Sequence, residues 1–162
     1  MRIGVISDTH GLFDRAILRQ FSGVDHILHA GDIGRGDVLA QLQRIAPVTA
    51  VSGNVDGFEA SGVPVEQLVE LVGHRIAITH RLYEGGRLTK DGMDLLARLR
   101  PAVCVYGHTH QPKAEWRDGV LLFNPGSAGP KRFHLPRAVG VLLLEHDTVE
   151  SHHILLADRA EI

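Results

Sequence analysis

In the first third of the chain, short apolar runs rich in β-branched residues alternate with segments of helical period. The apolar runs predict strands over residues 3–7, 25–30 and 48–52. Between them, two apolar faces at helical spacing predict helices that begin near Asp14 and Asp37: Ile17, Leu18 and Phe21 form the first face, and Val38, Leu42 and Ile45 the second. Strands that alternate with helices favour βαβ units and a parallel sheet, so the expected fold class is α/β.

The remainder of the chain contains more strands than helices. Residues 67–71 and 75–79 flank Val72-Gly73-His74, a pattern that predicts a hairpin. One helix is expected over residues 91–100, before Pro101, and a fully apolar strand over 102–106. The segments that follow suggest an antiparallel end to the fold, with strands over 113–116, 120–123, 138–144 and 149–156. No repeat or linker interrupts the sequence, and we expect a single domain over residues 1–162.

Composition excludes several classes of function. The 17 Lys and Arg residues against 19 Asp and Glu give a formal net charge of -2, without the positive excess that favours binding to nucleic acid. No apolar run reaches the roughly 18 to 20 residues needed to cross a bilayer, so no membrane association is expected. The single Cys104 cannot form an internal disulfide, and the first residues lack the pattern of a secretory signal. These features predict a cytoplasmic protein.

Five of the predicted strands end in the same way, because a side chain able to bind metal follows each apolar run, usually beside a glycine. The five segments are Asp8-Thr9-His10-Gly11, Gly31-Asp32, Gly53-Asn54, Thr79-His80 and Gly107-His108-Thr109-His110. In open α/β sheets, ligands bind beyond the carboxyl ends of the strands, where side chains from separate strands meet. The seven side chains are therefore expected in one crevice.

The seven side chains comprise two Asp, one Asn and four His, with no thiolate. This oxygen and nitrogen set favours transition metals over calcium or magnesium. Seven ligands exceed the three or four that one catalytic zinc uses, but they suit two ions about 3.5 to 4 Å apart that share a carboxylate. We expect two divalent transition-metal ions, with manganese ahead of iron, zinc, cobalt or nickel.

Each segment alone also has a structural interpretation. Asp8, Asp32 and Asn54 are residue types that form turns after strands, and an isolated His80 is more often a packed histidine than a ligand. Turn chemistry acting independently would rarely select metal-binding residue types at five strand ends. The combination therefore favours a metal site.

The order Asp-x-His, Gly-Asp, Gly-Asn, His and Gly-His-x-His over residues 8–110 resembles the calcineurin-like metallophosphoesterase superfamily. The short chain, the hairpin before His80 and the later Asn124-Pro125-Gly126-Ser127 are similar to the small YfcE-like phosphodiesterases. The resemblance implies a four-layer αββα sandwich of two mixed sheets flanked by helices.

The resemblance also implies a role for each ligand. Asp8, His10 and His110 would hold the first metal, Asn54, His80 and His108 the second, and Asp32 would bridge both. Asp32, Asn54 and His108 are also the expected catalytic residues. Two dications lower the pKa of a shared water, so that a bridging hydroxide can attack phosphorus in line. The implied activity is a phosphodiesterase acting on a small phosphoester.

Two departures from the superfamily pattern bear on the substrate. Many members have a histidine after Gly-Asn that assists the leaving group, whereas Val55-Asp56 follows here. Without a proton donor, diesters with activated or phenolic leaving groups should be favoured. Arg81 stands where the family usually has glycine, and two roles are open for it: binding phosphate bidentately, or an exposed charge.

A different class of function is a non-catalytic interaction scaffold, because some chains resembling this family serve that role with eroded metal sites. The complete ligand set argues against it, since buried carboxylates and imidazoles without metal would be costly. A nuclease is not indicated by the balanced charge. Homo-oligomerisation is possible on this sequence. His29 is expected to be a hydrogen-bonded core residue, and the pair Lys131-Arg132 a solvated loop charge more often than an anion site.

Overall fold

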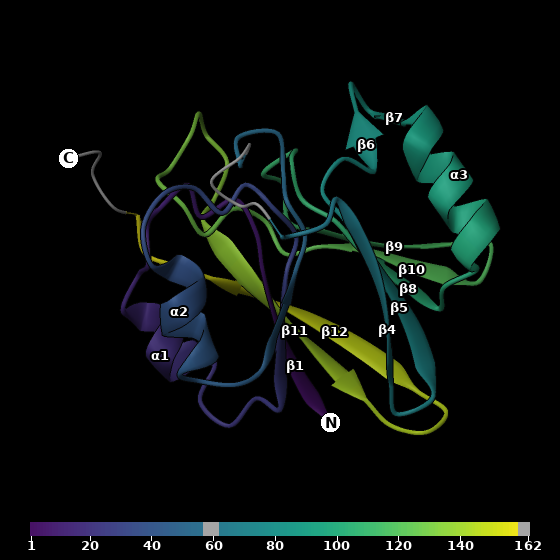
Figure 1. Ribbon diagram of the computed structural model, residues 1–162, viewed down its shortest axis with the longest axis horizontal. Coiled ribbons are helices and arrows are strands. Elements are labelled where there is room, and N and C mark those ends of the chain that lie inside the picture. The colour runs from purple at the N-terminus through teal and green to yellow at the C-terminus, as the bar shows by residue number, and fades with distance from the viewer. Residues whose placement is uncertain (57–61, 159–162) are drawn as a thin grey trace.

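Two five-stranded sheets lie face to face in the computed structural model, which describes residues 1–56 and 62–158 (Figure 1). The first sheet has the strand order β12-β11-β1-β2-β3, and the second has the order β4-β5-β8-β10-β9. The strands of the first sheet are β1 (Arg2–Ile6), β2 (His26–His29), β3 (Val48–Ala50), β11 (Ala138–Leu144) and β12 (Val149–Leu155). Strands β1, β2 and β3 are parallel to one another. Strand β11 pairs antiparallel with β1, and β12 pairs antiparallel with β11, so β12 again runs in the direction of β1.

The second sheet consists of two hairpins with a strand between them. Its strands are β4 (Glu66–Leu71), β5 (His74–Thr79), β8 (Val103–Val105), β9 (Lys113–Arg117) and β10 (Val120–Asn124). The predicted hairpin is formed by β4 and β5, and its turn residues Val72 and Gly73 both have positive φ (51° and 77°). Positive φ at both positions matches the right-handed twist of the strands. Strand β8 pairs in parallel with both β5 and β10.

Helices cover the outer faces of the sandwich. Helices α1 (Ala16–Gln20) and α2 (Val38–Gln43) lie on the first sheet, and α3 (Lys90–Leu99) lies on the second (Figure 1). This arrangement confirms the predicted four-layer αββα fold. The hydroxyl of Thr89 accepts a hydrogen bond from the amide of Gly92 and caps α3. No helix among the described residues is long and apolar enough to cross a membrane.

Two details of the helix prediction were wrong. Leu18 is 51% exposed, because α1 spans little more than one turn and buries only one side of it. Helix α2 ends at Gln43, so Ile45 lies beyond it. The segment between β5 and α3, for which no element is predicted from the sequence, contains a small hairpin of β6 (Tyr83–Glu84) and β7 (Arg87–Leu88). Strands of two residues are too short for a periodic signal.

Alternation along each strand produces separate cores on the two sides of the sheets. In β8, Val103 and Val105 point into the core between the sheets, and Cys104 points to the core under α3. Tyr106, directly after β8, belongs to the same outer core as Cys104. Cys104 is fully buried, as expected for a small core residue.

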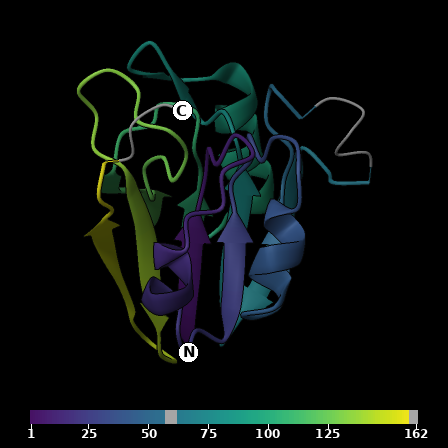
Figure 2. The ribbon, with the colours of Figure 1, turned by 90° about the vertical axis from the view of Figure 1, so that its left-hand side faces the viewer.

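The parallel strands of both sheets leave their carboxyl ends at one end of the sandwich. Figure 2 shows β1 and β2 running in the same direction toward a group of loops at the edge opposite the N-terminus. The loops after β1, β2, β3, β5 and β8 carry the seven residues singled out from the sequence. The topology therefore brings these loops together without long connections.

A buried arginine holds the loop that follows β10 in place through hydrogen bonds. Arg137 is 1% exposed and donates hydrogen bonds to the carboxylate of Asp14 and to the backbone carbonyls of Ala128, Gly129 and Ala157. The residue links the start of α1, the loop after β10 and the end of β12. Its guanidinium has enough fixed donors to satisfy four partners at once.

We expect Arg137→Met to lower the free energy of unfolding by about 3 to 5 kcal/mol, because the change removes one partner of a buried ion pair. Arg98→Met is the matched control, since Arg98 forms exposed ion pairs with Glu66 and Asp94. That change should cost about 1 kcal/mol or less. Urea unfolding of the two variants and the parent measures both values, and equal losses would contradict the role given to Arg137.

Candidate metal centre

Six of the seven predicted residues form one cluster at the carboxyl ends of the strands. Asp8 and His10 come from the loop after β1, Asp32 from the loop after β2, His80 from the end of β5, and His108 and His110 from the loop after β8. The side chains within 4.8 Å of one another fall into two groups that share Asp8: one with His10 and His110, and one with Asp32 and His80.

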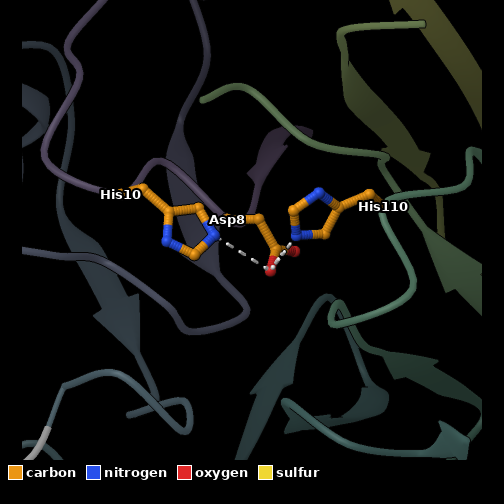
Figure 3. A group of neighbouring side chains, drawn as sticks. All are labelled: Asp8, His10 and His110. Carbon is orange, nitrogen blue, oxygen red and sulfur yellow. Dashed lines mark ion pairs between the residues drawn. The ribbon is translucent and has the colours of Figure 1, made fainter. Parts of the chain in front are cut away.

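Asp8 lies at the centre of the first group. Figure 3 shows the His10 and His110 rings on either side of it, with both pointing at the same carboxylate oxygen. The Nε2 atoms of His10 and His110 lie 3.9 Å and 3.2 Å from Asp8 Oδ1. The other oxygen, Oδ2, accepts hydrogen bonds from the hydroxyl of Ser7 (2.7 Å) and the amide of His108 (3.2 Å). The backbone and Ser7 thus fix the carboxylate so that Oδ1 faces the imidazoles.

Asp32 connects the two groups. Its Oδ2 lies 3.3 Å from His80 Nε2 and 3.8 Å from His10 Nε2, while its Oδ1 accepts a hydrogen bond from the amide of Val55 (3.1 Å). Asp32 Oδ2 thus lies between His10, which is predicted to bind the first metal, and His80, which is predicted to bind the second.

His108 and Asn54 lie farther out. The His108 ring centroid is 5.4 Å from that of His80, and His108 Nε2 is 3.6 Å from Glu84 Oε1 on the β6–β7 hairpin. Asn54 is exposed and lines a pocket with His80 and Arg81. The structure thus places Asn54 at the rim of the cluster.

Five of the seven residues adopt the left-handed backbone conformation. Their φ values are 55° for Asp8, 47° for His10, 52° for Asp32, 71° for His108 and 59° for His110. This region is sparsely populated by residues other than glycine and costs of order 1 to 3 kcal/mol each. Strain of this kind concentrates at functional sites, where the surrounding structure holds it in place.

Glycines allow the loops to approach the carboxylates closely. A Cβ atom on Gly53 would clash with the Asp32 carboxylate, and one on Gly107 would clash with Ser7 and with the Asp8 carboxylate. The glycines next to the predicted ligands are therefore required by space around the two acids.

Several supporting residues were not identified from the sequence as parts of the site. Asp56 is 4% exposed and accepts hydrogen bonds from the amides of Gly34 and Gly53, which ties the Asp32 loop to the Asn54 loop. Asn124 donates to the carbonyl of Gly107 and the hydroxyl of Thr109, and Ser127 donates to the carbonyl of Asp8. The position of Asp56, two residues after Asn54, was a weak indication that it belongs to the site. Its hydrogen bonds to the amides of Gly34 and Gly53 depend on how the two loops pack, which the sequence does not reveal.

His29 is a hydrogen-bonded core residue, as predicted. Its Nε2 lies 3.0 Å from the hydroxyl of Thr9, and its Nδ1 accepts a hydrogen bond from the amide of Gly31. Because Thr9 donates its proton to the carbonyl of Ile33, the hydroxyl accepts from His29 Nε2. The arrangement requires a neutral ring, and burial lowers the pKa of His29 from 6.5 to about 4.

The charges of the cluster shift the pKa values of its members. Burial opposes ionisation of Asp32, but the adjacent His80 and the Val55 amide outweigh it and lower its pKa to about 2. Burial likewise opposes ionisation of Asp8, and the neighbouring His110 and His80 hold its pKa below the usual range. Burial disfavours the charged form of His80, yet the Asp32 and Asp8 carboxylates raise its pKa. Both acids are therefore anionic near neutral pH.

Three buried atoms of the cluster have no hydrogen-bond partner among the described residues: Asp8 Oδ1, His10 Nε2 and His80 Nε2. His80 Nδ1 lies 2.7 Å from the carbonyl of Ala30, so the ring carries a proton there in either charge state, and loss of the second proton turns an unprotonated Nε2 toward two carboxylates. Lone pairs facing lone pairs repel unless a cation lies between them. The distances of 3.2 to 3.9 Å are about 1.5 to 1.9 times a usual metal–ligand distance of about 2.0 to 2.2 Å, as for two ligands of one ion, so the donor set fits a divalent metal.

A comparison with protein-family models matches residues 1–148 to the calcineurin-like phosphoesterase superfamily domain. The chain belongs to the calcineurin-like phosphoesterase superfamily. The resemblance inferred from the strand-end motifs is thereby confirmed. Members of this superfamily with similar sequences include a probable metallophosphoesterase from Methanothermobacter thermautotrophicus, which is 36% identical over 161 residues, covering 95% of this chain and 92% of that protein.

Two further comparisons concern the sequence and the fold, respectively. Phosphodiesterase YfcE from Escherichia coli K12 is 30% identical over 166 residues, covering 88% of this chain and 87% of that protein. A structure of Vps29 from Entamoeba histolytica in complex with Zn²⁺ superposes with a TM-score of 0.77 at 18% identity, covering 96% of this chain and 99% of that chain. That last likeness shows the fold alone.

We expect the stability of this superfamily member to fall as the pH decreases from about 6.5 to about 4, because the unfolded chain then binds a proton at His29 that the native state excludes. The loss due to His29 should reach about 3 kcal/mol. His29→Gln should remove that part of the slope between about pH 7 and about pH 4.5 in urea unfolding. His146→Gln, at an exposed turn, should keep it. If the free energy of unfolding of His29→Gln depended on pH as steeply as that of the parent, the assignment of this pH dependence to His29 would be wrong.

Proposed function

We propose that the chain is a metal-dependent phosphodiesterase that uses two divalent transition-metal ions, with manganese the expected metal. Membership of the phosphoesterase superfamily and the donor set described above support the proposal. The observation that carries it is the group of buried atoms Asp8 Oδ1, His10 Nε2 and His80 Nε2, which lack partners among the described residues. A non-catalytic scaffold would have no use for this strained and charged arrangement.

In this proposal, Asp8, His10 and His110 hold one ion, Asn54, His80 and His108 hold the other, and Asp32 lies between them. The ions would acidify a shared water and offset the charge on the phosphoryl oxygens. The protein holds its ligands rigid: Ser7 and the His108 amide orient Asp8, Val55 orients Asp32, and the Ala30 carbonyl keeps the proton of His80 on Nδ1. Such outer partners fix ring orientation and raise ligand basicity.

The preference for diesters rests on what stands next to Asn54. Val55 occupies the position of the histidine that assists the leaving group in many relatives, and Asp56 uses both of its oxygens to accept backbone hydrogen bonds. Loss of a general acid typically costs about 10²- to 10⁴-fold, least for leaving groups that depart without a proton. We therefore infer a preference for diesters with phenolic or other activated leaving groups.

Arg81 is proposed as a substrate-binding residue. It lines a pocket of about 530 Å³ that begins at Asn54 and His80, and its guanidinium forms an ion pair with Glu84. The ion pair holds the cation beside the cluster, where it can bind a phosphoryl oxygen. A cytoplasmic location is proposed as well, because the single Cys104 is buried and has no disulfide partner.

We expect the metal-stripped protein to regain hydrolysis of bis(p-nitrophenyl) phosphate when manganese is added, and to prefer this diester to p-nitrophenyl phosphate. Asp32→Asn should reduce turnover by more than the roughly 100-fold that loss of an outer partner of a metal ligand costs. Asp147→Asn makes the same chemical change at an exposed turn and should retain activity. Release of p-nitrophenolate measures the rates, and circular dichroism checks the fold.

Elemental analysis of the isolated protein provides a second readout, with about two transition-metal ions per chain expected. Inactivity of the parent with every divalent ion, together with a metal content near zero, would favour the scaffold. An active Asp32→Asn would refute the bridging role.

A further inference from the structure

A second cavity adjoins the cluster on the other side of Glu84. It has a volume of about 330 Å³ and lies by the β6–β7 hairpin, the end of β8 and the loop that follows it. The lining includes Tyr83, Tyr106, His108, Thr109 and Lys113. We refer to it as the tyrosine pocket. The pocket includes His108, which belongs to the cluster, and its size is at the lower end of small-molecule sites.

Tyr106 is the polar group that marks this pocket as a binding site. Its side chain is 1% exposed and lines the pocket, and its hydroxyl forms no hydrogen bond with another described residue. The enclosed atoms without a partner among the described residues are Asp8 Oδ1, His10 Nε2 and His80 Nε2, so the Tyr106 hydroxyl is open to the pocket. A tyrosine hydroxyl is neutral near pH 7 and can donate a hydrogen bond. It is therefore available to a ligand that carries a hydrogen-bond acceptor.

The rest of the lining favours a flat ring. The ring centroids of Tyr83 and Tyr106 lie 5.5 Å apart, and the ring planes are inclined at 45°. The ammonium of Lys113 lies 5.4 Å from the centroid of the Tyr83 ring. Two aromatic side chains offer apolar contact to a planar group, while Thr109, Gln111 and Lys113 supply polar groups. A planar ring with acceptor atoms, as in a nucleobase or a nitrophenol, matches this lining.

Glu84 lines both the tyrosine pocket and the larger pocket at Asn54 and His80. Its Oε1 lies 3.6 Å from His108 Nε2, so the carboxylate stands in front of the cluster between the two pockets. A phosphodiester carries two organic arms on one phosphorus. A phosphoryl group at the cluster has one pocket on each side of Glu84, and each pocket can take one arm.

We propose that the tyrosine pocket binds one arm of the diester substrate and selects a planar aromatic arm whose acceptor atom accepts a hydrogen bond from the Tyr106 hydroxyl. The proposal rests on the phosphodiesterase function proposed above. Tyr106 is thus a specificity-determining residue, and it need not take part in the chemical step.

Three diesters with the same p-nitrophenolate leaving group test this assignment: bis(p-nitrophenyl) phosphate, thymidine 5′-(p-nitrophenyl phosphate) and methyl p-nitrophenyl phosphate. Because the leaving group is shared, differences in kcat/KM, each divided by the rate of the uncatalysed hydrolysis of the same ester, report on the arm that stays. The parent should favour at least one aromatic-arm substrate over the methyl ester by about tenfold or more. A preference between the phenyl and thymidine esters distinguishes a phenolic arm from a nucleobase.

Tyr106→Phe keeps the ring and removes only the hydroxyl. It should raise KM for the favoured aromatic-arm diester about three- to tenfold, with kcat and the methyl ester unchanged. Ser151→Ala removes a hydroxyl from β12 in the other sheet and should change none of these values. A parent that hydrolyses all three diesters equally, or a Tyr106→Phe variant that lowers all three alike or none, would overturn the proposal.

A binding measurement separates this proposal from the proposed function. If the parent hydrolyses no diester, thymidine and p-nitrophenol can be titrated into the labelled protein and followed by NMR. Shifts at the amides of Gly85, Gly86 and Thr109 that weaken in Tyr106→Phe would support the pocket without any activity. Their absence with both ligands would overturn the pocket assignment.

Discussion

The central physical constraint in this protein is the burial of two carboxylates and several imidazoles that face one another without enough protons to pair them. Asp8 and Asp32 remain anionic, and the proton of His80 is held on Nδ1 by the carbonyl of Ala30. Such a cluster is costly unless cations occupy it. The backbone strain at five of its residues and the glycines around its acids have the same explanation, since both serve to bring the ligands together.

Much of this arrangement could be predicted because it depends on local patterns. Parallel strands are recognisable by their apolar runs, and the residues that follow them must meet at one edge of the sheet. The fold class and family followed from these signals and were confirmed. The convergence of Asp8, His10 and Asp32 required no knowledge of side-chain contacts, only the order of strands and the residue types at their ends.

The remaining features depend on contacts between distant segments, for which the sequence carries little signal. Nothing in the sequence distinguishes Arg137 from a surface arginine. Its guanidinium nevertheless donates a hydrogen bond to the carboxylate of Asp14, which lies 123 positions earlier in the chain. Asp56 holds two loops through their amides, and neither bond has a sequence pattern. The β6–β7 hairpin has strands of two residues, so its presence and the position of Glu84 arise from packing rather than from periodicity.

The two pockets and the missing proton donor point to the same kind of substrate. A site without an acid beside the leaving group works best on esters whose leaving group is stable as an anion, and aromatic alcohols provide such groups. Binding energy from the arm that does not react can then position phosphorus over the cluster. Tyr83 and Tyr106 offer that energy through ring contacts and one free hydroxyl among the described residues. Under the proposed function, a pocket for a flat ring would thus compensate in binding for the absence of a general acid beside Asn54 among the described residues.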